Sequence, residues 1–281
     1  MAANVAWWRC LRPGGASKPD TLVVSGGGLK GVAALGAVHA LRRRGMLDSV
    51  TTMVGTSAGA LVCAALACGK DPLDVLRRIG PKTFRPDIDI ARLPFSYGLD
   101  SGAGLVRFID EVLEERHTFE SLRRVRGVRL VVCVTNLNRR EPEYLGPDTH
   151  PHMDVALALR MSCSVPLYFT AVRVAGEDVY VDGVLTDNFP CEWALANGAR
   201  GVLGIRFASS QGPIRSLDAY LMALADCAVR HGPRRSTRGV RVLELHPGIP
   251  TSVNFNAPRA EVRRLFASGV QQARTWVKKT E

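Results

Sequence analysis

The sequence predicts an α/β fold in which a parallel or mixed sheet is covered by helices on both faces. Short runs of β-branched and aliphatic residues alternate with longer segments whose apolar residues recur at helical spacing. Of the 281 residues, 46% are hydrophobic and 22% are charged, as in ordinary globular proteins. No repeat or linker divides the chain. We therefore expect a tail over residues 1–20 and a single α/β domain over residues 21–281.

Two strand–turn–helix units open the predicted domain. Residues 21–25 form a short β-branched run that ends at three glycines, and residues 31–44 follow with helical spacing. Residues 49–54 predict a second strand, and the alanine-rich residues 58–68 predict a second helix that Gly69 ends. Each turn thus lies at the carboxyl end of a buried strand. Open α/β sheets bind their ligands at these ends.

The rest of the chain continues the alternation less regularly. We expect further helices over residues 101–116, 154–161, 217–230 and 258–279, and further strands over residues 129–135, 178–181, 201–207 and 241–245. The apolar stripe of the last helix predicts packing against the core rather than contact with a membrane. The proline-rich residues 81–98 have no clear period, and we expect them to form a lid.

The net charge of +11 comes mostly from arginines in short clusters. Three interpretations compete: an ordinary solvated surface, a face attracted to anionic phospholipid head groups, and a nucleic-acid-binding surface. No aromatic residue interleaves with an arginine cluster, as a stacking platform for bases would require. We therefore expect no nucleic acid as partner, while an ordinary solvated surface and a surface in peripheral contact with a membrane both stay open.

The seven cysteines are odd in number and irregularly spaced, without a Cys-x-x-Cys pair. This pattern argues against a disulfide framework or a zinc site and favours a reducing compartment. No carboxylate cluster indicates calcium, so we expect neither metal nor cofactor. No apolar run has the length of a signal peptide or a transmembrane span. We expect an intracellular protein, cytoplasmic or bound peripherally to a membrane.

The strongest local motif is the pentapeptide Gly-Thr-Ser-Ala-Gly at residues 55–59. It fits G-x-S-x-G, the sharp strand-to-helix turn that holds a nucleophilic serine outward. Gly55 and Gly59 would let the strand and the helix approach closely. Because a predicted strand precedes Ser57 and a predicted helix follows it, we favour a nucleophile over a serine that merely caps a helix.

A second motif, Gly-Gly-Gly-Leu-Lys-Gly at residues 26–31, also lies between a strand and a helix. Its backbone amides could stabilise the negative charge that develops on a carbonyl oxygen during acyl transfer. The same residues fit the dinucleotide pattern G-x-G-x-x-G. That fold requires an acidic residue at the end of the next strand, whereas Asp48 precedes the strand here. The acyl-transfer interpretation is therefore favoured.

A nucleophilic serine needs a base, and Asp182 is the best-placed candidate. It follows a predicted strand and precedes Gly183, although an aspartate that only fixes a turn is a common alternative. An α/β-hydrolase would instead need a histidine after the serine. His231 and His246 have the required order but lie in no distinctive loop, and His39 falls in the middle of a predicted helix.

Together these motifs resemble the patatin-like phospholipases over roughly residues 22–195. The resemblance rests on the glycine loop, the serine pentapeptide and Asp182-Gly183, and on two segments between and after them. These are Arg-Met-Ser-Cys-Ser-Val-Pro at residues 160–166 and Asp-Asn-Phe-Pro at residues 187–190. One departure is Val184, where the family usually has Gly or Ala, and its bulk would narrow the pocket. Residues 196–281 form an extension without a recognised counterpart.

The resemblance implies a three-layer fold with a mostly parallel sheet and a Ser57–Asp182 dyad that works without histidine. It also implies an oxyanion hole and a set of supporting motif residues. The oxyanion positions are Gly26, Gly27, Gly28 and Ala58, and the supporting positions are Lys30, Gly31, Gly55, Gly59 and Gly183. Lys30 would orient the loop, attract a phosphate or simply be solvated.

The implied function is hydrolysis of acyl esters of a phospholipid or another glycerolipid through an acyl-enzyme. An acyltransferase or a thioesterase could use the same dyad, because the acceptor merely replaces water. A catalytically silent protein that binds lipid surfaces is an alternative from another class, which the intact motifs argue against. The sequence leaves head group, acyl position and chain length open.

Overall fold

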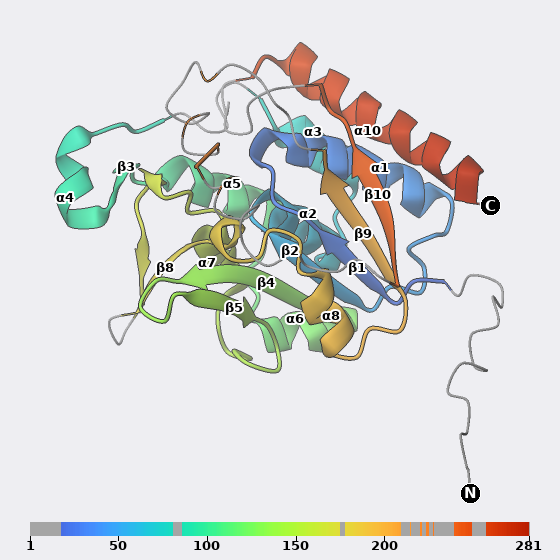
Figure 1. Cartoon of the computed structure of the whole chain (residues 1–281), viewed down its shortest axis with the longest axis horizontal. Coiled ribbons are helices and arrows are strands. Elements are labelled where there is room, and N and C mark those ends of the chain that lie inside the picture. The colour runs from blue at the N-terminus through green and yellow to red at the C-terminus, as the bar shows by residue number, and fades with distance from the viewer. Residues whose placement is uncertain are drawn as a thin grey trace, which may run out of the picture.

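The computed structural model describes residues 18–80, 86–174, 178–208, 239–248 and 257–280, together with residues 214, 220, 223, 224 and 227. Its centre is a twisted sheet with strand order β10-β9-β1-β2-β4-β8-β7, and β5 pairs with β4 (Figure 1). A small second sheet joins β3 and β6. The strands are β1 (Thr21–Val24), β2 (Thr52–Thr56), β3 (Gly98–Asp100), β4 (Arg129–Asn136), β5 (Glu141–Leu145), β6 (Leu167–Phe169), β7 (Val172–Arg173), β8 (Val179–Asp182), β9 (Val202–Phe207) and β10 (Val240–Leu245).

Parallel pairing joins the five strands β10, β9, β1, β2 and β4. Antiparallel pairing joins β5 and β8 to β4, and β7 to β8. The prediction of an α/β fold with a mostly parallel sheet is therefore confirmed. Strands β9 and β10, which follow residue 195, extend the same sheet as the strands before it.

Helices cover both faces of the sheet. Successive side chains of each strand point to opposite faces, so both faces carry apolar side chains that helices bury. Leu22 and Val24 of β1 join the main core, while Val23 joins a smaller cluster on the other face with Cys191 and Ala194. The helices are α1 (Gly31–Arg43), α2 (Ala58–Ala67), α3 (Pro72–Arg78), α4 (Leu93–Ser96), α5 (Ala103–Leu113), α6 (Phe119–Arg126), α7 (Val155–Ser162), α8 (Cys191–Ala196) and α10 (Arg259–Thr280). Short 3-10 helices are η1 (Gly28–Lys30), η2 (Ile90–Arg92) and η3 (Gly183–Leu185).

The long C-terminal helix α10 lies along α1 at the edge of the molecule (Figure 1). Two glycines make this contact close: a Cβ on Gly36 would come within 2.1 Å of the Phe266 carbonyl oxygen, and one on Gly269 within 1.9 Å of the Ala33 oxygen. Val262 and Phe266 are buried with α1 in the core. The prediction that this helix packs on the core is therefore confirmed.

The predicted second strand is displaced by about half its length. It spans Thr52–Thr56 rather than residues 49–54, because α1 ends in a turn in which Gly45 donates to the Arg42 carbonyl and Val50 to the Leu47 carbonyl. The predicted helix over residues 217–230 falls mainly outside the described residues. Within the described part of the chain, no helix combines the length and the apolar character needed to cross a membrane.

Candidate active site

Ser57 forms the turn between β2 and α2 with φ 52° and ψ −126°, a conformation that is strained for a residue other than glycine. The turn is tight because the helix starts directly beside the sheet. A Cβ on Gly59 would lie only 2.2 Å from the Val24 carbonyl oxygen, and one on Gly55 only 2.5 Å from the Ala60 backbone nitrogen. Both flanking glycines are therefore required by close packing, as the sequence predicts.

Sheet register brings Asp182 to the level of Ser57. Thr56 of β2 pairs with Cys133 of β4, and the next residue of β4, Val134, pairs with Asp182 of β8. Because β8 runs antiparallel to β4, its last residue lies two positions in from the end of β4 rather than beyond it. Strand β4 lies between β2 and β8, so the residues at the C-terminal ends of these two strands lie at the same level of the sheet.

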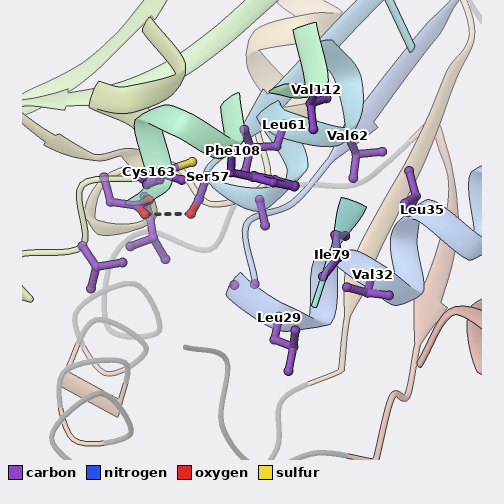
Figure 2. Close-up of a pocket in the computed structure, with 18 of the residues that line it drawn as sticks. Leu29, Val32, Leu35, Ser57, Leu61, Val62, Ile79, Phe108, Val112 and Cys163 are labelled. Carbon is purple, nitrogen blue, oxygen red and sulfur yellow. Dashed lines mark hydrogen bonds between the residues drawn. The ribbon is translucent and has the colours of Figure 1, made fainter. Parts of the chain in front are cut away.

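The Ser57 hydroxyl donates to Asp182 Oδ2 at 2.7 Å, and both side chains are buried (Figure 2). The other carboxylate oxygen, Oδ1, accepts the Val184 amide at 2.9 Å. The Asp182 backbone is also fixed, since its amide donates to the Ser164 carbonyl and its carbonyl accepts the Thr135 hydroxyl, each at 2.9 Å. These bonds hold the carboxylate in one orientation toward the serine.

Burial raises the pKa of Asp182 from an ordinary value near 3.8 to about 7, because the apolar surroundings disfavour the charged carboxylate. The hydrogen bonds from Val184 and Ser57 act in the opposite direction and lower the pKa. A carboxyl group with a pKa near neutrality can take up and release a proton with little energetic cost. The environment therefore suits Asp182 to general-base work.

The glycine loop, residues 26–31, lies beside the pocket that Ser57 and Asp182 line. Gly27 is the N-cap of η1, Gly28 begins η1 and Ala58 begins α2, so their amides are among those that have no acceptor within their own helix. All three residues line the pocket that contains Ser57 and Asp182. Gly26 differs, because its amide donates to the Asn188 carbonyl at 3.3 Å.

An apolar pocket of about 910 Å³, counting its open mouth, leads away from Ser57 between helices α1, α2, α3 and α5. Figure 2 shows Phe108 and Leu61 close to the serine and Leu35 at a distance from it. Val184 is one of the lining residues, so its bulk reaches the pocket as the sequence predicts.

Ser162 is a site residue that sequence reasoning noted only as part of a motif. Its hydroxyl accepts the Ser57 amide at 2.8 Å and donates to the Cys133 carbonyl at 2.7 Å, fully buried. It thereby ties the serine turn to β4. The only sequence signal was its place in the serine-rich segment, which does not reveal the direction of the side chain.

Arg160 of the same segment is a buried cation beside the site. Its guanidinium donates to the Ser101 carbonyl at 3.1 Å, to the Thr170 carbonyl at 3.0 Å and to the Ser164 hydroxyl. Burial lowers the pKa of Arg160 from its ordinary value. Because the Ser164 carbonyl accepts the Asp182 amide, Arg160 braces the segment that holds the carboxylate.

The supporting motif residues surround the pair. Gly31 lines the pocket, and Gly183 begins η3, where a Cβ would meet the Cys133 carbonyl oxygen at 2.5 Å. Lys30, the last residue of η1, is partly buried and is not one of the lining residues.

Histidines are absent from the described lining of the pocket. The imidazole of His246 is largely exposed, 3.9 Å from Glu244 on β10, and His231 lies outside the described residues. In the described part of the chain, no three His, Cys, Asp or Glu side chains are grouped to hold a metal ion. Residues 81–85 of the predicted lid also lie outside the described residues.

The family model for patatin-like phospholipases matches residues 22–195, more than half of the chain. The chain belongs to this family. Among curated proteins, the patatin-like chain is 24% identical over 185 residues to the probable lipid hydrolase 463L of Invertebrate iridescent virus 6. That alignment covers 62% of this chain and 63% of the viral protein. A second relative, human omega-hydroxyceramide transacylase, is 28% identical over 178 residues, which are 62% of this chain and 32% of the enzyme.

Solved structures share the patatin-like fold. VipD from Legionella pneumophila superposes with a TM-score of 0.63 and 18% identity, covering 94% of this chain and 67% of that protein. Human GIVD cytosolic phospholipase A2 superposes with a TM-score of 0.55 and 12% identity, covering 93% of this chain and 60% of the human chain.

Proposed function

We propose that this chain is a lipid acyl hydrolase in which Ser57 is the nucleophile and Asp182 its base. The observation that carries the proposal is the hydrogen bond of 2.7 Å from the Ser57 hydroxyl to a buried carboxylate that lines the same apolar pocket. A nucleophile within hydrogen-bond reach of a base that a third group orients is the arrangement that covalent catalysis requires. Here the Val184 amide orients the base.

In the first step, Ser57 Oγ attacks the ester carbonyl carbon while its proton passes to Asp182. The carbonyl oxygen becomes an oxyanion, which we assign to the amides of Gly27, Gly28 and Ala58. The amide of Gly26 is left out because it already donates to Asn188. The start of α2 adds a favourable dipole for negative charge.

The tetrahedral intermediate then expels the leaving alkoxide, which takes the proton from Asp182 and departs as an alcohol. The acyl group remains on Ser57 as an ester. A water molecule next gives its proton to Asp182 and attacks this ester, and the regenerated Ser57 alkoxide recovers the proton as the fatty acid leaves.

The pocket supports an aliphatic acyl chain as the bound part of the substrate. Its described lining beyond the catalytic pair and the glycine backbone is almost wholly apolar, from Leu29 and Val32 on one side to Phe108 and Val112 on the other. Burying each methylene of such a chain contributes about 0.8 kcal/mol. The head group would remain at the mouth of the pocket.

The decisive experiment is a panel of phospholipids and neutral glycerolipids with mass-spectrometric identification of the products. We expect free fatty acid from the wild-type chain and none above background from Ser57→Ala. A fluorophosphonate probe should label the peptide that contains Ser57, and the label should be missing in the variant. Equal fatty-acid release by both proteins would refute the proposal.

Transfer of the acyl group to an alcohol is the second candidate, because one relative is named a transacylase. The acyl-enzyme is common to both reactions, and only the acceptor differs. Adding a long-chain alcohol to the lipid assay distinguishes them. A new ester that replaces the free fatty acid would establish a transferase.

A further inference from the structure

Five large apolar side chains stand exposed together at one end of the molecule. Ile90 and Phe95 are 78% and 80% exposed, and their neighbours share the feature. We call this set the apolar rim; it consists of Ile88, Ile90, Phe95, Tyr97 and Leu167. Helix α4, which carries Phe95, projects away from the central sheet (Figure 1).

The backbone beneath the apolar rim is held by hydrogen bonds. The Asp89 amide donates to the Leu99 carbonyl at 2.8 Å, and the Ala171 amide donates to the Ser96 carbonyl at 3.0 Å. The buried Asp100 carboxylate accepts the Asp87 amide at 2.9 Å. The exposed side chains are therefore presented outward from a fixed support.

The apolar rim adjoins the pocket through the small sheet. Gly98 of β3 pairs with Leu167 of β6, which belongs to the rim, and Asp100 pairs with Phe169. Phe169 lines the pocket together with Val165. One strand thus carries a rim residue at its start and a pocket residue at its end.

The chemistry of the rim fits a lipid–water interface. Its side chains are exposed Ile, Leu, Phe and Tyr, which a fluid bilayer accommodates without matching their shape. The Arg173 guanidinium lies 5.1 Å from the centre of the Tyr97 ring, and such amphipathic pairs suit the level of the head groups. Arg92 lies 3.1 Å from Asp87 and 3.9 Å from Asp89, which reduces the repulsion of phosphate by these two carboxylates. The net charge of +11 adds attraction to anionic lipid.

We propose that the apolar rim docks the chain on phospholipid membranes, with Ile90 and Phe95 inserted at the boundary between head groups and acyl chains. The inference rests on the proposed function, because a lipid acyl ester has to reach the pocket from a membrane. Docking at the rim would bring the wall of the pocket that contains Phe169 next to the bilayer.

Docking can be tested in the catalytically disabled Ser57→Ala chain, so that hydrolysis does not alter the vesicles. Sedimentation with vesicles of phosphatidylcholine and a minor fraction of phosphatidylserine measures binding. Ile90→Ser with Phe95→Ser should weaken binding at least about tenfold, because two apolar anchors are lost. Val125→Ser with Leu137→Ser is the matched control, since these side chains are 64% and 42% exposed elsewhere. Unchanged binding in the rim variant would overturn the proposal.

Two further measurements separate the possible failures. Turnover of a soluble short-chain ester by the rim variant with Ser57 intact should equal wild type, whereas failure of the proposed function would remove that turnover from both proteins. In the Ser57→Ala chain, Phe95→Trp should show added fluorescence that brominated lipid quenches. If the rim variant instead dissociates a dimer in lipid-free sedimentation, the rim is a protein interface and the membrane proposal is wrong.

Discussion

The Ser57 amide donates a hydrogen bond of 2.8 Å to the Ser162 hydroxyl, which in turn donates to the Cys133 carbonyl. This relay anchors the strained turn to the neighbouring strand β4. Ser162→Ala leaves a buried amide without its acceptor and allows the nucleophile to shift. We expect kcat to fall about 10- to 100-fold with little change in KM, since small misplacements of a reacting group are costly.

A matched control for this variant is Ser25→Ala. Ser25 is also buried in a strand-end turn, but its hydroxyl has no hydrogen-bond partner in the described part of the chain. Its loss should leave turnover close to wild type. Fluorophosphonate labelling should slow in Ser162→Ala while circular dichroism stays unchanged. Equal kcat values for the two variants would show that the relay does not position Ser57.

The raised pKa of Asp182 predicts the pH dependence of the reaction. Only the carboxylate can accept the serine proton, and burial keeps the group protonated up to a pKa of about 7. On a soluble ester, kcat/KM should therefore rise as pH increases through about 7 and then level off. Asp182→Asn should lower the plateau by about 100- to 10,000-fold and abolish this limb. A wild-type limb near pH 4 would contradict the buried-base mechanism.

The same shift predicts how stability depends on pH. Between about pH 4 and 7 the unfolded chain has released the Asp182 proton while the folded chain retains it, so the free energy of unfolding falls as pH rises. Each unit of pKa shift corresponds to about 1.4 kcal/mol. Asp182→Asn should remove this loss. At pH 8 its free energy of unfolding should exceed that of wild type by an amount on the order of a few kcal/mol.

Chemical denaturation of both proteins at pH 5 and pH 8 measures this effect. The difference between variant and wild type should be larger at pH 8. A difference that is independent of pH would mean that Asp182 is not buried as a neutral acid.

Histidine substitutions separate a dyad from a triad. His246 follows the end of β10, is largely exposed and is not one of the residues that line the pocket, so His246→Ala should leave kcat close to wild type. His231 lies outside the described residues, and the family resemblance predicts the same result for His231→Ala. Loss of turnover in either variant, with circular dichroism unchanged, would favour an α/β-hydrolase triad.

Much of the fold could be predicted because its central strands are short apolar runs bounded by glycine. The predicted strand over residues 129–135 matches β4, and Asp154 caps α7 by accepting the Ala156 amide at 2.7 Å. The weaker strands were missed, including β5, which contains Glu141 and Pro142. Such polar edge strands are defined by their partner β4 rather than by their own pattern.

Topology predicted one half of the site's assembly, whereas the other half was implied only by the family resemblance. Ser57 and the glycine loop each follow a parallel strand, so their meeting at one edge of the sheet follows from topology. The meeting of Asp182 with Ser57 depends instead on β8 running antiparallel to β4 with Val134 opposite Asp182. Periodicity carries no information on strand direction. The role of Ser162 stayed hidden because the sequence also does not reveal the direction of a single side chain.

The depth of the pocket should set the acyl-chain length. Leu35 of α1 lines the pocket at a distance from Ser57 (Figure 2), so the terminal part of a long chain would reach it while a short chain would not. Leu35→Trp fills that space and should lower kcat/KM for long-chain esters about 10-fold or more, since each methylene in an apolar pocket contributes roughly 1–3 kcal/mol to discrimination. The shortest esters should react at the wild-type rate, because Ser57, Asp182 and the glycine loop are unchanged.

A series of p-nitrophenyl esters of increasing chain length measures the effect, and Val125→Trp on the exposed face of α6 controls for the added bulk. A uniform loss over all chain lengths would mean that Leu35 supports the fold and that the acyl chain lies elsewhere.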